Sequence, residues 1–290
     1  MVSVRARREQ VAYARGRGLS CRRACMLLSV ARSELNYKSR MPAKDAPLAK
    51  ELSELARRHP RLGYRMARNR LSTKVSYSRV YRVWKAEGLG LPRRRPRKKV
   101  RGGGHRWMQA ITPNAVWAFD FVHDECANGQ KLKCLLVVDE WTHEVLAVEV
   151  GARIRSNDVV ATLARLVSLY GPPAFVRSDN GPEFVAKAVR SWLTTQRIEA
   201  SYIEPGKPWQ NGVAESLINR FRDECLSVEW FNHRVEAKAV IEAWRRDYNQ
   251  CRPHSSIAYA TPASRRKEWI EEFGPRWGIG YPREIRTLSA

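Results

Sequence analysis

Three carboxylates are the residues whose type and spacing could do chemistry. Asp120 stands between Phe119 and Phe121 in the β-rich run AVWAFDFVH. Asp179 ends the run AFVRSD, and Glu215 lies in a predicted helix. Each acid alone is as often structural as functional, but three on neighbouring elements repel one another unless cations lie among them. Carboxylate oxygens suit Mg²⁺, or Mn²⁺ in its place, and two ions about 3.5–4 Å apart stabilise the attacking and leaving oxygens of a displacement at phosphorus.

The local patterns predict how these acids are presented. Side chains alternate between the two faces of a strand, so the carboxylate of Asp120 is expected on the face opposite its aromatic neighbours. Asp179 is expected at a strand end, where open sheets meet ligands. The helix that carries Glu215 has polar residues at steps of four, four and three, which places them on one face: Asn211, Glu215, Asn219 and Arg222.

The order of elements from Trp107 onward predicts the fold of this part. Three β-rich runs, AVWAFDFVH, KCLLVVDEW and EVLAVEVG, suit an antiparallel meander. A helix capped by Ser156 and stopped at Gly171, a strand AFVRSD, a helix opened by Pro182, a strand EASYIE and a helix after Asn211 follow. A further helix is expected over residues 236–247, and irregular chain from Cys251. This order predicts an α/β, ribonuclease-H-like core with a mixed five-stranded sheet over residues 107–270, and a tail over 271–290.

The positive charge is confined to the first third of the chain. Residues 1 to 106 hold 30 Lys or Arg and 6 Asp or Glu, an excess of 24, whereas residues 107 to 290 hold 23 of each. A solvated basic surface is the plain interpretation. An excess this localised favours a polyanionic partner, because each phosphate that is neutralised releases counterions and raises affinity.

This basic third is predicted to hold small helical modules. Residues 1–40 resemble a helix-turn-helix, with Ser20 as an N-cap and Ala24, Leu27 and Leu28 at helical spacing. After a linker over residues 41–47, a second DNA-binding module is expected over residues 45–90, with a plain three-helix packing unit as the alternative. In its last helix Val80, Val83 and Trp84 form an apolar stripe, and the basic residues that lie off it are phosphate contacts: Arg79, Arg82 and Lys85. Residues 91–106 are expected to be a basic linker.

The composition excludes several classes of protein. Hydrophobic residues make up 43% of the chain, which is typical of a folded protein. The sequence shows neither a membrane span nor a secretory signal, so a cytoplasmic protein is expected. The six cysteines form no C-x-x-C pair; Cys21 and Cys25 could share a metal, but no second Cys or His pair follows at zinc-finger spacing.

Several motifs, taken together and in order, resemble a known family. WAFDFV, RSDNGPEF, QNGVAES and YNQCRPHSSIAYATPA look like the OrfB-type Asp-Asp-Glu transposases of bacterial insertion sequences, which are related to retroviral integrases. The resemblance covers nearly the whole chain, including 35 residues between Asp179 and Glu215. The N-terminal run GLSCRRACMLLSVARSELNY also looks like that family's upstream helical modules.

The resemblance implies roles for particular residues. Asp120, Asp179 and Glu215 match the metal-binding catalytic triad, and Arg222 matches the basic residue that approaches the DNA. The residues that match turns near the DNA are Asn180, Gly181, Gln210, Asn211 and Gly212. Arg252, Pro253 and His254 match an Arg-Pro-His segment, for which fold support and DNA contact are equally open.

The resemblance also implies partners and a reaction. A transposase that frees a 3′-hydroxyl at an element end and joins it to target DNA is the leading hypothesis, with double-stranded DNA as partner. A homo-oligomer when two ends are paired, an upstream-frame protein as fusion or partner, and a nucleoid-associated location are also implied. The alternatives are a ribonuclease-H-type nuclease and a DNA-binding regulator with an inert core; two basic modules favour DNA joining, and three intact acids disfavour the regulator.

Overall fold

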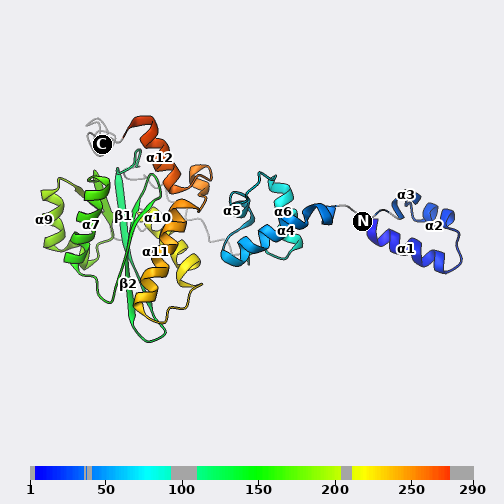
Figure 1. Cartoon of the computed structure of the whole chain (residues 1–290), viewed down its shortest axis with the longest axis horizontal. Helices are drawn as coiled ribbons and strands as arrows, with labels where there is room; N and C mark the ends of the chain where they lie inside the picture. Colours follow the sequence, from blue (N-terminus) through cyan, green and yellow to red (C-terminus); the bar gives the residue numbers. More distant parts are fainter. Residues whose placement is uncertain (1–3, 36, 38–40, 93–109, 204–210, 275–290) are drawn as a thin grey trace. The chain divides into compact units, whose positions relative to one another are not determined.

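The chain forms two compact units, Met1–Lys50 and Glu51–Ala290. The computed structural model describes residues 4–35, 37, 41–92, 110–203 and 211–274 (Figure 1). The predicted basic linker over 91–106 falls almost entirely outside these residues, as does Gln210.

The first unit holds three short helices. They are α1 (Val4–Gly16), α2 (Cys21–Leu27) and α3 (Arg32–Leu35). Ser20 caps α2 as predicted, since its hydroxyl accepts a hydrogen bond from the Arg23 N–H at 3.4 Å. Val11, Ala24 and Val30 are buried, and Leu28 packs against them, whereas Leu27 of the same predicted pattern is 71% exposed. The helix-turn-helix role stays a prediction.

Helix α4 (Met41–Arg58) overturns the predicted linker over residues 41–47. Pro47 lies inside this helix, where it cannot donate a backbone hydrogen bond. Leu48 and Leu52 are both buried one turn apart, and their packing continues the helix past the proline. Burial of these two leucines therefore outweighs the tendency of Pro47 to interrupt a helix.

Two further helices, α5 (Tyr64–Arg68) and α6 (Tyr77–Ala86), follow. The predicted stripe on α6 is confirmed, because Val80, Val83 and Trp84 are all buried. The basic residues of the same helix lie off this stripe: Arg82 and Lys85 are exposed and Arg79 is half-buried. One side of α6 therefore packs while the other carries cations.

Residues 110–274 are built on a mixed five-stranded sheet, as predicted. Its strands are β1 (Val116–Glu125), β2 (Lys131–Asp139), β3 (Val145–Gly151), β4 (Phe175–Ser178) and β5 (Glu199–Tyr202). They lie in the order β3-β2-β1-β4-β5. β1, β2 and β3 form the antiparallel meander, whereas β4 and β5 run parallel to β1. This is a ribonuclease-H-like sheet.

Helices cover both faces of this sheet (Figure 1). The helices α7 (Ser156–Tyr170), α8 (Pro182–Val185) and α9 (Lys187–Thr195) pack on the face that carries Trp117 and Phe119. The helices α10 (Gly212–Phe221) and α11 (Arg234–Gln250) pack on the other face, against Ala118 and Val122. A π-helical turn over Arg222–Leu226 extends α10.

Several element boundaries differ from the prediction, including that of α11, which begins two residues earlier and ends three residues later than expected. The N-cap of α7 is Arg155 rather than Ser156, since the Arg155 N–H donates to the Asp158 carboxylate at 2.8 Å and fixes the first turn one residue earlier. The helix opened by Pro182 breaks at Ala186, whose backbone is extended. The chain after Cys251 is not irregular throughout.

A short 3-10 turn (Ser255–Ile257) leads into α12 (Pro262–Phe273). The hydroxyl of Thr261 accepts from the Ser264 N–H at 3.2 Å, and Pro262 occupies the first turn, so the start of α12 is well capped. The helix crosses the predicted boundary at 270 and ends at Phe273. None of the helices in the described ranges is long and apolar enough to cross a membrane.

Candidate active site

Asp120 lies on β1 and faces α10. The aromatic side chains of Trp117 and Phe119 belong to the core under α7 and α9, while Ala118 and Val122 belong to the core under α10. Strand alternation therefore puts Asp120 on the α10 side, as the sequence predicted. Its side chain is half-buried and accepts a hydrogen bond from the Phe121 N–H at 2.7 Å.

Asp179 is brought beside Asp120 by the sheet register. β4 pairs with β1 only through Val116 to Ala118, with Arg177 opposite Ala118. Because the two strands are parallel, continuing this register by two residues brings Asp179 level with Asp120. From Phe119 onward, that edge of β1 has no partner strand in the described part of the chain, so the acids lie along an open edge.

The turn after Asp179 is tight. The Gly181 N–H donates to the Asp179 carboxylate at 3.0 Å, and the Asn180 amide donates to the Ile203 carbonyl at 2.9 Å. A Cβ on Gly181 would lie 3.0 Å from the Asp179 Oδ1 and 3.3 Å from the Phe184 ring, so a side chain here would push the carboxylate out of place. Asn180 and Gly181 thus shape the turn that presents Asp179.

Glu215 projects from the exposed side of α10. The opposite side of the helix is buried against the sheet through Ala214, Leu217 and Phe221. Glu215, Asn219 and Arg222 are exposed, which confirms most of the predicted polar face; Asn211 is instead buried at the N-cap. Arg222 opens the π-helical turn that ends α10.

The pKa of Asp120 responds to charged residues on the other elements of the site. Burial raises the pKa of its carboxyl from 3.8 to about 6; the Phe121 N–H opposes this, and the negative charges of Asp179 and Glu215 add to it. The positive charge of Arg222 lowers the pKa slightly. All three acids and the arginine therefore act within one electrostatic environment, although they come from three separate elements.

The donor set fits a hard divalent cation. Carboxylate oxygens alone are what Mg²⁺ and Mn²⁺ prefer, and a cation would relieve both the burial and the repulsion that raise the pKa of Asp120. Within the described residues, no three acidic, His or Cys side chains lie close enough to enclose a metal ion as they stand. The fold brings the acids to one edge, and closing them around an ion requires side-chain movement.

Arg252 and His254 lie in the protein interior. Arg252 makes a bidentate ion pair with Glu224, with nitrogen–oxygen distances of 2.6 and 2.7 Å, and its side chain is only 6% exposed. His254 stacks on His143 with ring centres 6.0 Å apart. Burial and the nearby cations of Arg252 and Arg220 lower the pKa of His254 to about 2, so the ring is neutral. These positions favour the fold-support alternative over DNA contact.

The sequence did not point to an ion pair between β2 and α8. Lys133 on β2 ion-pairs with Glu183 on α8, and its Nζ lies 4.0 Å from the centre of the Phe121 ring. This pair lowers the pKa of Glu183, chiefly through the hydrogen bond from Lys133. Glu183 stands in the motif RSDNGPEF, but nothing in the alternation of β2 marks Lys133 as its partner.

The chain is similar to integrase core domains and to proteins of bacterial insertion elements. Two family models, each described as an integrase core domain, match residues 111–208 and 196–262. The chain is 40% identical over 248 residues to an insertion element IS407 protein of Burkholderia multivorans, covering 84% of this chain and 90% of that one. It is 26% identical over 198 residues to the transposase InsD of insertion element IS2 from Escherichia coli, covering 65% of each.

Solved structures show the same similarity at lower identity. The catalytic core domain of HTLV-2 integrase, in complex with magnesium, is 21% identical, with a TM-score of 0.39. The match covers 53% of this chain and 97% of that one.

Truncating Arg252 should destabilise the fold. Arg252→Ala leaves Glu224 without its partner, and we expect a loss of about 3 kcal/mol in the free energy of unfolding, measured by urea denaturation. Arg246→Ala is the matched control, because Arg246 is 68% exposed and its pair with Glu242 should contribute less than about 1 kcal/mol. Weaker DNA binding by a fully stable Arg252→Ala protein would instead support a DNA contact.

The raised pKa of Asp120 should appear as pH-dependent stability. Between about pH 4 and 6 the folded protein holds this proton more tightly than the unfolded chain, so stability falls as pH rises through that window. In metal-free buffer we expect Asp120→Asn to raise the free energy of unfolding by about 1–2 kcal/mol at pH 8, a value reduced because the carboxyl is partly solvated. At pH 4 the same substitution should change the free energy of unfolding little.

The same denaturation series supplies the control. Glu229→Gln, at an exposed acid outside the site, should have no such pH-dependent effect. Adding Mg²⁺ at pH 8 should stabilise the wild type more than Asp120→Asn. An equal effect of Asp120→Asn at both pH values would show that burial and repulsion do not act on this carboxyl.

Proposed function

We propose that this chain, which belongs to the bacterial insertion-element transposases related to integrases, cuts a phosphodiester at an element end and joins the freed 3′-hydroxyl to target DNA. Transposase function follows from membership of the family. The metal dependence, the two chemical steps and the residues that carry them are the proposal.

The observation that carries the proposal is the shared electrostatic environment of Asp120, Asp179 and Glu215. Burial, together with the negative charges of Asp179 and Glu215, disfavours the ionised form of Asp120 unless positive charge lies nearby. A structural role alone would not favour three acids at an open sheet edge. A phosphoryl-transfer role does, because the reaction needs cations at the same place.

The three acids would hold one or two Mg²⁺ ions, or Mn²⁺ in their place. When bound, such ions supply charge that lowers the pKa of the attacking water or hydroxyl and neutralises the developing charge at phosphorus. Asp120 contributes a fixed ligand from the rigid centre of the sheet. Asp179 contributes one from a turn that its bond with the Gly181 N–H holds in shape.

Glu215 and Arg222 supply the helical side of the site. Glu215 is exposed on α10 and can turn toward the sheet edge when an ion offers it a partner. Arg222 is exposed on the same side of the helix as Glu215, and its positive charge lowers the pKa of Asp120, which supports a contact with a phosphate of the DNA being cut.

DNA would be delivered by the basic first third of the chain. The catalytic part carries no net excess charge, whereas residues 1 to 106 carry the whole excess of 24. We assign element-end binding to the helical modules and chemistry to the sheet. Pairing of two ends requires more than one copy, and an upstream-frame protein as fusion or partner is part of this proposal.

Loss of one carboxylate should abolish chemistry and spare DNA binding. We expect Asp120→Asn and Glu215→Gln each to reduce Mg²⁺-dependent 3′-end cleavage and strand transfer at least 1,000-fold, on the order of 4 kcal/mol in the barrier. A labelled duplex that carries the element's terminal repeat is the substrate. Glu229→Gln is the control, and undiminished cleavage by Asp120→Asn would refute the triad.

The exposed side of α6 should contribute to DNA affinity. Replacing Arg79, Arg82 and Lys85 with Ala removes three cations without touching the buried stripe. If each contacts a phosphate, the slope of log affinity against log salt should fall by about 2.7 for duplex DNA. Replacing the exposed Arg246, Lys267 and Arg165 is the charge-matched control. Equal slopes for the two triple variants would contradict the assignment.

A further inference from the structure

Backbone pairing between the two segments that carry the aspartates stops short of both acids. β4 pairs with β1 as far as Arg177 opposite Ala118, two residues before Asp179 and two before Asp120. In the described part of the chain, the pairing of these two strands does not continue beyond that point. Contacts made by side chains are therefore what sets the separation of the two carboxylates.

A phenylalanine that follows Asp179 contacts both phenylalanines that flank Asp120. The ring of Phe184 on α8 meets Phe119 edge to face, with ring centres 4.7 Å apart and an interplanar angle of 68°. It stacks on Phe121 at 4.8 Å and 5°. Both arrangements are ones that aromatic pairs prefer. These three rings, which we call the aromatic clamp, join the two segments where the backbone does not.

The aromatic clamp fixes the backbone on both sides of Asp120. Neighbouring side chains of a strand point to opposite faces, so holding Phe119 and Phe121 from one face fixes how Asp120 projects from the other. The Phe121 N–H also donates to the Asp120 carboxylate at 2.7 Å. A shift of Phe121 would therefore move a hydrogen-bond donor of the carboxylate directly.

On the other side, the aromatic clamp reaches Asp179 through Gly181. The Phe184 N–H donates to the Gly181 carbonyl at 2.9 Å, and the Gly181 N–H donates to the Asp179 carboxylate at 3.0 Å. Phe184 is the buried residue of the four-residue helix α8, with 1% exposure. Its ring therefore holds this short helix, and the turn before it, against the sheet.

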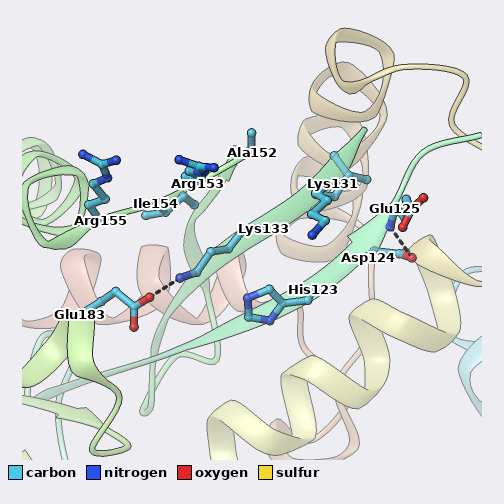
Figure 2. Close-up of a pocket in the computed structure, with 11 residues that line it drawn as sticks. His123, Asp124, Glu125, Lys131, Lys133, Ala152, Arg153, Ile154, Arg155 and Glu183 are labelled. Carbon is cyan, nitrogen blue, oxygen red and sulfur yellow. Dashed lines mark hydrogen bonds and ion pairs between the residues drawn. The ribbon is translucent and has the colours of Figure 1, made fainter. Parts of the chain in front are cut away.

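An ion pair supports the aromatic clamp from β2. Figure 2 shows Lys133 reaching Glu183, the neighbour of Phe184, with its Nζ 2.5 Å from the Glu183 Oε1. The same Nζ lies 4.0 Å from the centre of the Phe121 ring, a distance at which a cation is attracted to the ring face. Lys133 therefore contacts the α8 side of the clamp through charge and the β1 side through the ring.

We propose that the aromatic clamp and the Lys133–Glu183 pair are positioning groups that hold Asp120 and Asp179 at the separation a divalent cation needs. The proposal rests on the proposed function, in which these carboxylates bind Mg²⁺. The clamp lies on the face of the sheet opposite Asp120, so it acts through the backbone and touches no reacting atom. Contacts that orient metal ligands in this way typically change metal affinity by about 10-fold to 100-fold.

The test measures Mn²⁺ binding by the full-length protein at pH 8, from the electron paramagnetic resonance signal of the free ion. Lys133→Glu and Glu183→Lys each break the ion pair, and Lys133→Glu/Glu183→Lys restores it with the charges exchanged. We expect each single variant to raise the dissociation constant of Mn²⁺ by at least about 10-fold. The double variant should return to within about 3-fold of the wild type, because the link between β2 and α8 is restored.

The two single variants separate positioning from the effect of charge alone. Lys133→Glu makes the surroundings of the acids more negative and would, by charge alone, strengthen cation binding. Glu183→Lys makes them more positive and would weaken it. Positioning predicts weaker binding in both variants.

A core variant separates positioning from loss of stability. Phe184→Leu keeps an apolar side chain but removes both ring contacts, and we expect the same rise of about 10-fold in the dissociation constant. Leu166→Ala removes a buried side chain of α7 from the same core and should destabilise the fold at least as much, with Mn²⁺ binding within about 2-fold of the wild type. Binding is measured well below the unfolding midpoint of each variant, and the charge-exchange series decides if Phe184→Leu does not fold.

Mg²⁺-dependent cleavage of an element-end duplex gives a second measurement. Phe184→Leu should need about 10-fold more Mg²⁺ for half-maximal cleavage and should approach the wild-type rate when Mg²⁺ is saturating. Leu166→Ala should show the Mg²⁺ requirement of the wild type.

Several results would overturn the clamp and leave the proposed function standing. These are wild-type Mn²⁺ affinity in Phe184→Leu, opposite effects of Lys133→Glu and Glu183→Lys, and equal losses in Phe184→Leu and Leu166→Ala. A wild type that binds Mn²⁺ no better than Asp120→Asn would overturn both proposals, since these carboxylates would then hold no cation.

Discussion

The half-buried carboxyl of Asp120, at an open sheet edge and within the influence of the charges of Asp179 and Glu215, is the constraint on which the catalytic half of this protein depends. Each acid is carried by an element that is fixed by something other than the acid itself: β1 by its pairing with β2, the turn after β4 by its own hydrogen bonds, and α10 by a buried apolar side. The fold therefore brings the three acids to one edge of the sheet through backbone contacts that do not depend on the acids. Burial of Asp120 disfavours its ionised form and makes a cation the natural remedy.

The strands of the sheet were predictable from sequence because side chains alternate between the two faces of a strand with a period of two residues. Alternation along β1 separated the aromatics from Asp120, and the order of runs gave the meander and the two parallel strands. The acids were predictable one by one, and the polar side of α10 was predictable from steps of three and four residues. Alternation along a strand does not show which elements lie side by side. The ion pair between Lys133 on β2 and Glu183 on α8 therefore appeared only in the structure.

The errors have physical causes at particular residues. Pro47 was taken as a helix breaker, but burial of Leu48 and Leu52 outweighs one lost hydrogen bond. Thr261 caps the start of α12, but the irregular segment before it hid this helix start in the sequence. For Arg252 the sequence left fold support and DNA contact open, and only its ion pair with Glu224, 28 residues earlier in the chain, favours fold support.

Several arginines of the catalytic half are paired with glutamates inside the fold. Arg177 pairs with Glu140, Arg252 with Glu224, and Arg266 with Glu144, all largely buried. These cations join segments of the fold to one another and are buried away from DNA. A core that was basic all over would hold DNA in many registers, because phosphate contacts carry no sequence information. Leaving the bulk attraction to the first 106 residues, where the whole excess of positive charge lies, keeps the catalytic core from holding DNA in registers that bring no phosphate to the carboxylates.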